Sequence, residues 1–345
     1  MSRLLPIAAV STLALCLAAP GLAADYGMYP ELRPAYPNQW ALPEDDPLRF
    51  EAGLRYWYSW GEQDFDVGPL NQSTSDTTHS GEAHFRIDDD STQSYVKGYA
   101  GYAFLMEGDY STTVSSGSIA NGRLGYVGAD FGYMPFGNEV GSVGGLIGYL
   151  YWNDSPNAGR NSFTAADSSA DIAWTEGSPF YNLGFDSEAN NLDIHALRLG
   201  LTGRAEISDM IDITAEVAAV PYAHVSGNLG NVLMDSASGP FTGNNVFLSS
   251  PVNVEGMGYG AMGEVMVGFK PTENMALRVG GRAWYLQGQT EATYSTVSVI
   301  GPADSDADGD LDQAPTLTEQ GYITTQDNPF SLFRYGLLAE LSVTF

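Results

Sequence analysis

The feature that most constrains this chain is an alternation of apolar and polar residues that first appears between Leu48 and Trp60. One face of this segment is apolar or aromatic and consists of Leu48, Phe50, Ala52, Leu54, Tyr56, Tyr58 and Trp60. The other face is mostly polar and consists of Arg49, Glu51, Gly53, Arg55, Trp57 and Ser59. A period of two residues is that of a β-strand, whose successive side chains point to opposite faces. The segment therefore predicts a long strand with one apolar face.

The same alternation returns along the chain in segments of about ten residues, the length of a membrane-spanning strand. These segments are residues 123–134, 142–153, 192–207, 211–224, 257–270, 277–287 and 333–345. Beyond residue 24, no stretch approaches the roughly 18 consecutive apolar residues of a spanning helix. Repeated strands with an apolar face are typical of a barrel that crosses a membrane. We therefore expect an all-β, antiparallel, up-and-down transmembrane β-barrel.

The composition agrees with this fold and argues against nucleic acid as a partner. Only 16% of the residues are charged, whereas the chain contains 40 glycines and 20 tyrosines. The formal net charge is −28, and nucleic-acid recognition depends on clustered Lys and Arg.

The first 24 residues predict a secretory signal peptide. Arg3 supplies the positive charge, residues 4–19 are apolar, and Gly21 and Ala23 occupy the positions that a small-residue cleavage site requires. The single cysteine lies in this segment, so the mature chain has no disulfide. Residues 25–47 contain five prolines and predict an extended periplasmic lead-in, with a plug inside the lumen as the alternative. The barrel itself is expected over residues 48–345.

The connections between the segments alternate in length. Short turns lie near residues 135–141, 208–211 and 271–275, whereas 154–190, 227–255 and 291–330 are long and acidic. Outer-membrane barrels have short periplasmic turns and long external loops. Residues 93–117 can supply two strands with a turn at Glu107-Gly108-Asp109. With them the count is ten, which we prefer, and without them it is eight; both are even, as in bacterial single-chain barrels.

The C-terminal sequence "LLAELSVTF" resembles the assembly signal of bacterial outer-membrane β-barrels. The resemblance is carried by Tyr335, Leu341, Val343 and the terminal Phe345, although Glu340 stands where such endings commonly have glycine. It implies recognition by the barrel-assembly machinery, a place in the bacterial outer membrane, and contact with lipopolysaccharide.

The inward faces of the strands collect most of the basic residues, together with a similar number of carboxylates. This expected charge network in the lumen comprises Arg49, Glu51, Arg55, Lys97, Asp130, Arg198, Arg204, Glu206, Glu216, Glu264, Arg278, Arg282, Arg334 and Glu340. A barrel of eight to ten strands has an interior that side chains nearly fill. The network therefore favours a closed structural interior, with a narrow charge-lined pore as the alternative.

Aromatic residues at the segment ends predict the girdles that anchor a barrel at the two membrane interfaces. The expected outer girdle is Trp57, Tyr58, Trp60, Tyr151, Trp152, Trp284 and Tyr285, and the expected periplasmic girdle is Tyr133, Phe136, Phe269 and Phe345.

The ten-strand layout and the segments "GGLIGYLYW" (144–152) and "LGLTGRAEI" (199–207) resemble the omptin family of outer-membrane proteases. Omptins carry an Asp pair and an Asp–His pair at the extracellular rim. Here the alternation places His224 on the inward face with Asp212, Thr214 and Glu216, but its i−2 neighbour is Tyr222 rather than Asp. Asp193 and His195 lie on an outward face. The acidic run 88–90 is equally compatible with a solvated loop. The sequence therefore predicts no catalytic residue and ranks a surface protease third.

The stretch "DSDADGDLD" has the oxygen-ligand spacing of a calcium-binding loop. Its candidate ligands are Asp304, Asp306, Asp308, Asp310 and Asp312, with Gly309 at the position of the sharp turn. Pro315 replaces the bidentate Glu at the twelfth position, and no helix is expected on either side. The stretch is compatible both with weak Ca²⁺ binding and with a solvated acidic loop tip.

Together these features predict a structural or surface-exposed outer-membrane protein whose acidic loops attract divalent cations. A small cation-preferring, porin-like channel is the second expectation.

Overall fold

In the computed structural model, residues 47–68, 70–112, 116–138, 140–158, 172–178, 181–183, 189–230, 246–248 and 250–345 are described. Ten long strands dominate: β1 (Leu48–Val67), β2 (Leu70–Asp89), β3 (Ser94–Thr112), β5 (Arg123–Asn138), β6 (Gly141–Ser155), β9 (Asn191–Ser208), β10 (Ile211–Asn228), β12 (Asn253–Thr272), β13 (Met275–Ile300) and β14 (Thr316–Thr344). Short strands β4 (Ser116–Ala120) and β11 (Val246–Leu248) pair with β3 and β13, and β7 (Ile172–Trp174) pairs with β8 (Tyr181–Leu183). The expected signal peptide and nearly all of the expected lead-in lie outside the described residues.

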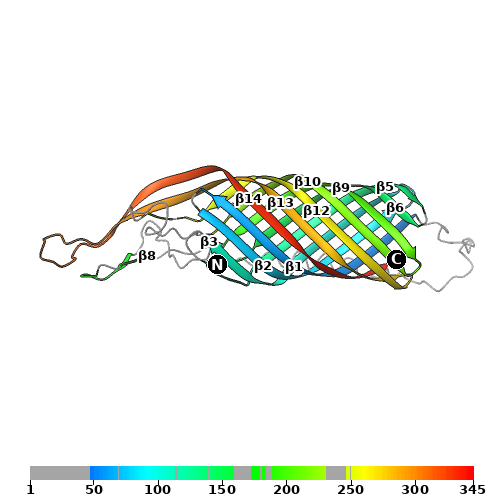
Figure 1. Ribbon diagram of the computed structural model, residues 1–345, viewed down its shortest axis with the longest axis horizontal. Helices are drawn as coiled ribbons and strands as arrows, with labels where there is room; N and C mark the ends of the chain where they lie inside the picture. Colours follow the sequence, from blue (N-terminus) through cyan, green and yellow to red (C-terminus); the bar gives the residue numbers. More distant parts are fainter. Residues whose placement is uncertain are drawn as a thin grey trace, which may run out of the picture. The chain divides into compact units, whose positions relative to one another are not determined.

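The ten long strands form a closed ring of antiparallel pairs. Each pairs with the next along the chain, and β14 pairs with β1 over Phe65↔Phe330 to Glu51↔Thr344 (Figure 1). The seam ends in two backbone hydrogen bonds between Phe50 and Phe345, with N···O distances of 3.1 and 2.9 Å. Closure leaves no open sheet edge, which a lipid environment requires. The expected antiparallel β-barrel is therefore confirmed. Within the described residues, no helix is both long and apolar enough to span a bilayer.

The ring contains the preferred number of ten strands, but the sequence reached that number by two compensating errors. The stretch 70–89 was not recognised as a strand, yet β2 pairs with β1 along its whole length. Residues 93–117 do not form two spanning strands, since β3 runs straight through Glu107-Gly108-Asp109 to Thr112. With β4 and β11 included, the whole sheet has twelve strands.

The outer face of the ring carries an apolar belt, as a lipid-facing surface must. Exposed members on successive strands include Leu54, Phe85, Val96, Phe131, Ile147, Leu199, Val217, Val265, Val279 and Leu337. The exposed aromatics expected on the periplasmic side, Tyr133, Phe136, Phe269 and Phe345, also lie on this surface. The end with short turns between β2 and β3, β5 and β6, β9 and β10, and β12 and β13 is thus the periplasmic end.

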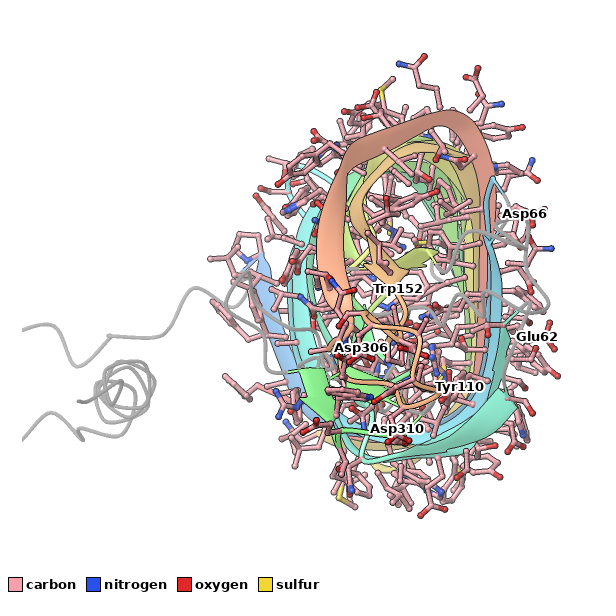
Figure 2. The ribbon with its side chains drawn as sticks, turned by 90° about the vertical axis from the view of Figure 1, so that its left-hand side faces the viewer. Glu62, Asp66, Tyr110, Trp152, Asp306 and Asp310 are labelled. Carbon is pink, nitrogen blue, oxygen red and sulfur yellow. The ribbon has the colours of Figure 1, made fainter. Side chains whose placement is uncertain are left out.

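Three members of the expected outer girdle are instead inside the barrel. Trp57, Trp152 and Trp284 are 0%, 1% and 3% exposed and face the lumen. In each strand they alternate with an outward neighbour, such as Tyr58 beside Trp57, so the strand period places them with the inward polar residues. Figure 2, a view of the extracellular end, shows Trp152 within the ring of strands.

Several strands continue beyond the apolar belt on the extracellular side. On β1 the outward residues change from Tyr58 and Trp60 to Glu62, Asp64 and Asp66, and Figure 2 shows Glu62 and Asp66 on the outside of the ring. The stretch 291–330, expected as a loop, is mostly a hairpin of β13 and β14 that stays paired up to Ile300↔Thr316 (Figure 1). The aspartate-rich stretch forms the tip of this hairpin.

Candidate functional site: the interior of the barrel

The periplasmic mouth of the barrel opens into a cavity of about 400 Å³. Arg49, Arg86 and Arg204 line it, together with Asp88 and Glu206. Arg86 pairs closely with Asp88, at 2.7 Å, whereas Arg49 is 3.9 Å from the same carboxylate. We call this group the periplasmic cluster. The Nζ of Lys270 is 2.8 Å from the Glu206 carboxylate at its edge.

Above this mouth, Arg278 and Arg55 hold four strands together through shared carboxylates. The Arg278 guanidinium on β13 lies 2.6 Å from Glu51 on β1, 2.5 Å from Glu340 on β14 and 3.1 Å from Asp212 on β10. Arg55 on β1 donates to the other oxygen of Glu340 at 2.5 Å. The partners of Arg278 come from strands one or two places away on both sides of β13, so these contacts tie neighbouring stretches of the wall together.

Arg282 on β13 occupies the next level. Its guanidinium is 2.6 Å from Glu82 on β2 and 2.7 Å from Glu264 on β12. Arg55 lies 3.1 Å from Glu82 and 3.4 Å from Glu264, so the two arginines share the same two carboxylates. The hydroxyl of Tyr126 donates a further hydrogen bond to Glu82 at 2.9 Å.

A second set of ion pairs joins the strands on the other side of the lumen. Arg198 on β9 pairs with Asp130 on β5 at 2.8 Å and also with Glu216 on β10. The Nζ of Lys97 on β3 lies 3.1 Å from Glu216. Arg198 also donates to the Tyr99 hydroxyl at 2.8 Å. These residues and those around Arg55, Arg278 and Arg282 form what we call the central network.

An aromatic layer covers the central network on its extracellular side. It consists of Trp57, Tyr126, Trp152 and Trp284, whose rings pack edge to face or tilted at centroid distances of 4.8–5.8 Å. The guanidinium carbon of Arg282 lies 5.1 Å from the Trp57 ring and 5.5 Å from the Trp284 ring. Such cation–π contacts are strongest where water is excluded, so the layer both closes the lumen and stabilises the charge beneath it.

A further buried cluster lies beyond the aromatic layer, in the extracellular extension. Arg334 is 1% exposed and binds Asp76 through two hydrogen bonds, at 2.9 and 2.8 Å. Its Nη2 is also 3.5 Å from Asp154. Asp154 lies above the membrane belt, because its strand neighbours Asn153 and Ser155 face outward there. Burial raises the pKa of Asp154 to about 6, since one guanidinium serves two carboxylates and its closer contact is with Asp76.

Within the described residues, these contacts fill much of the interior of the barrel with paired side chains. The cavities shrink from about 400 Å³ at the periplasmic mouth to about 60 Å³ beside Glu51 and His84, and to about 10 Å³ beside Arg198 and Arg282. Breaking one partner out of a buried ion pair typically costs about 3–5 kcal/mol. Removal of a single charged side chain from the network is therefore expected to destabilise the barrel, and the network leaves little space for a solute.

The structure brings most of the residues expected in the lumen into mutual contact. Thirteen of the fourteen lie in the periplasmic cluster or the central network as described above, with Arg204 3.5 Å from Asp212. Arg334 is the exception, since it lies in the separate extracellular cluster. Sequence reasoning missed Asp76, Glu82, His84, Arg86 and Asp88 as inward residues, because β2 had not been recognised. Its signal is the alternation of Glu82, His84 and Arg86 with Ala83, Phe85 and Ile87.

The aspartate-rich tip is a compact loop closed by two backbone hydrogen bonds between Ala303 and Gln313. Within it, Asp304, Asp306 and Asp308 each offer an oxygen within 4.8 Å of the other two. Asp304 accepts backbone hydrogen bonds from Ala307 and Gly309 at 2.6 and 2.8 Å. Hydrogen bonds from Ser305 lower the pKa of Asp312. Asp310 and Asp312 are not part of the three-carboxylate group.

The residues weighed for an omptin-like site are far from converging at the extracellular rim. The acidic run 88–90 lies at the periplasmic end, at the turn between β2 and β3. His224, expected to face inward, lies directly opposite the outward-facing His195. The reason is a β-bulge at Pro221–Tyr222, where the pairing of β10 shifts on both sides.

Comparisons with known proteins show the fold and nothing finer. No family model and no curated protein matches the chain. Among solved structures, the outer-membrane protease OmpT from Escherichia coli superposes with a TM-score of 0.55 at 10% identity, over 87% of this chain and 98% of that chain. The translocator domain of the autotransporter NalP from Neisseria meningitidis aligns over 86% of this chain and 90% of that chain at 10% identity, but with a TM-score of only 0.31.

The closed ring and the apolar belt are those of a membrane-spanning β-barrel, and the likeness to OmpT shows that the two chains share this fold. The expected place in the bacterial outer membrane agrees with this fold. The chain is similar to OmpT in fold alone.

Proposed function

We propose that this protein is a closed outer-membrane barrel with a structural, surface-exposed role, and that its extracellular strands and acidic tip, not its lumen, contact other molecules. The observation that carries this proposal is the filling of the interior. The central network joins strands three or four places apart in the ring, through Arg282–Glu82 and Lys97–Glu216, and the aromatic layer covers it. A conducting barrel needs a continuous water-filled path, which these side chains occupy.

The exposed charges support a surface role in which divalent cations take part. Outward acidic residues extend along β1 as Glu62, Asp64 and Asp66, and the hairpin tip adds Asp306 and Asp308. Such surfaces concentrate divalent cations. Ca²⁺ or Mg²⁺ held there can bridge to the phosphates of lipopolysaccharide, which are themselves anionic.

Solute entry into proteoliposomes tests the closed interior. The purified barrel is expected to leave small sugars and amino acids excluded at the rate of protein-free vesicles, whereas a porin reconstituted in parallel admits them. A matched variant, Glu82→Ala with Arg282→Ala, removes one buried anion and one buried cation and leaves the net charge unchanged. Faster entry through the wild-type barrel than through protein-free vesicles would support the cation-preferring channel instead.

We also infer that the barrel is not a protease. The two candidate histidines, His195 and His224, lie on its outer face, and the acidic run 88–90 lies at the opposite end of the barrel. General acid–base catalysis needs groups within hydrogen-bond reach of one substrate. Cleavage of a peptide library by the purified barrel, abolished in His224→Ala, would contradict this inference.

A further inference from the structure

Two of the four histidines in the chain meet on the outer face of the barrel. His195 on β9 and His224 on β10 are directly opposite in the antiparallel ladder. Their ring centroids are 6.4 Å apart, with the ring planes inclined by 28°. Directly opposed residues of an antiparallel pair have their Cβ atoms about 4.5–5.5 Å apart, so both imidazoles can reach one ion placed between them.

The bulge in β10 is what creates this pair. Counting by twos from the outward-facing Val217 would place Ala223 outward and His224 in the lumen, but Ala223 is buried. The extra residue at Pro221–Tyr222 reverses the phase, so that Ala223 faces inward and His224 faces outward. β-Bulges commonly re-aim a side chain next to a functional site. Proline fits here because a bulge spares it from donating to the ladder.

Hydrogen bonds already orient one imidazole for metal binding. The Tyr149 hydroxyl lies 2.5 Å from Nδ1 of His195. When Nδ1 carries the proton and donates to this hydroxyl, the free lone pair is on Nε2. Metal-binding histidines are typically fixed in this way through their second nitrogen.

Two further donor groups flank the pair. Asp193 lies two residues from His195 on the same face, and its Oδ1 accepts hydrogen bonds from Tyr151 and Asn153 at 2.5 and 2.9 Å. Both bonds end on Oδ1. On the other side, Met257 of β12 is directly opposite His224 and is 62% exposed. His195 and His224, together with these two neighbours, thus offer one carboxylate, two imidazoles and one thioether.

The pair lies at the extracellular edge of the apolar belt, where ions have access. On β9 the outward residues change from Leu197 below His195 to Asp193 above it, and on β10 they change from Tyr222 to Ser226 around His224. The site is therefore at the headgroup level and open to water.

We propose that His195 and His224 form a surface site for a transition metal of the imidazole-binding class, with copper as the preferred ion. Imidazole ligands suit Cu, Zn and Ni, and Cu²⁺ binds most tightly among the divalent first-row ions. The thioether of Met257 favours Cu⁺ as well. Ca²⁺ and Mg²⁺, which prefer oxygen ligands, do not compete for this site.

His79 supplies a matched control within the same protein. It also lies on the outer face, and its Nδ1 is 2.5 Å from the Tyr56 hydroxyl. Its directly opposed neighbours are Tyr58 on β1 and Leu105 on β3. It therefore shares the tyrosine contact and the outward position of His195 but has no imidazole directly opposite in the ladder.

The test is Cu²⁺ titration of the full-length mature barrel, purified in detergent without a polyhistidine tag, with millimolar Ca²⁺ present to occupy oxygen-rich sites. Wild type is expected to bind one Cu²⁺ per chain with the electron paramagnetic resonance signature of two nitrogen ligands. His195→Ala and His224→Ala should each weaken Cu²⁺ binding by at least about tenfold, because loss of a residue that only supports a metal ligand already has an effect of this size. Each single variant should leave one coupled nitrogen. His79→Ala should leave both affinity and spectrum unchanged.

Heat-modifiable migration on gels establishes that each variant is folded. If His224→Ala does not fold, Tyr149→Phe serves instead, since it keeps both ligands and should weaken binding by about tenfold. The proposal is overturned if the double variant His195→Ala/His224→Ala keeps the two-nitrogen spectrum, or if His79→Ala weakens Cu²⁺ binding as much as His224→Ala does.

Discussion

Replacing Asp154 by asparagine is expected to stabilise the barrel at pH 8 and to have little effect at pH 4. In the folded protein the pKa of this buried carboxyl is about 6, against an ordinary value of 3.8. Well below pH 4 the carboxyl is largely protonated in both states, and Asp154 then resembles its amide analogue. As the pH rises from about 4 to about 6, the unfolded chain ionises first, so the folded state loses stability.

The difference of about two pKa units corresponds to roughly 3 kcal/mol of unfolding free energy above pH 6. Asp76→Asn is the matched contrast, because Asp76 holds Arg334 through two hydrogen bonds of 2.9 and 2.8 Å. Removing its charge breaks the closer half of a buried pair, so at pH 8 it should destabilise the barrel by about 3–5 kcal/mol. The two asparagine variants are therefore expected to shift stability in opposite directions.

The assay is reversible urea unfolding in detergent, followed by tryptophan fluorescence at pH 4 and pH 8. Because other carboxylates also titrate in this range, the quantity compared is the variant minus wild type at each pH. If Asp154→Asn destabilises the barrel at pH 8 as much as Asp76→Asn does, then Asp154 is an ionised and necessary partner of Arg334, and the reasoning about the shared guanidinium is wrong.

Three further outcomes are expected. Arg282→Ala leaves Glu82 and Glu264 without their closest cation, and urea unfolding should show a loss of about 3–5 kcal/mol; a loss below 1 kcal/mol would contradict the central network. Calorimetric titration of the intact barrel should reveal weak Ca²⁺ binding, with Kd of about 10⁻⁴–10⁻³ M, that Asp304→Asn removes; no heat at millimolar Ca²⁺ would leave the tip as a solvated loop. Deletion of Phe345 should lower the amount of folded barrel in the outer membrane, and unchanged amounts would speak against the assembly signal.

The fold was predictable because its signal is the two-residue alternation of apolar and polar residues, which the sequence itself contains. Alternation such as that of Leu48–Trp60 has only one physical meaning when it recurs without apolar helices. The inward position of Arg278, Arg282 and Glu340 followed from the same period. Which carboxylate meets which guanidinium did not follow, since pairs such as Arg282 and Glu82 come from strands 200 residues apart in sequence.

The incorrect predictions also have local causes. β2 was overlooked because its extracellular half, from Asn71 to Ser80, is polar on both faces, and only a strand above the membrane tolerates that pattern. Trp57 was assigned to the membrane interface by residue type, although its place in the period put it inside. The two-residue period placed His224 on the inward face, but the bulge at Pro221 turns its side chain outward. Bulges change the phase of a strand and leave only a weak trace in a single sequence.

Closure of the lumen can be measured by single-channel recording in planar bilayers with and without Ca²⁺. The wild-type barrel is expected to insert without steady conductance steps in either condition. The charge-matched variant Glu82→Ala/Arg282→Ala, which removes the middle of the network, is expected to conduct or to flicker. Steady, cation-selective steps from the wild-type barrel would contradict the claim and identify the protein as a channel.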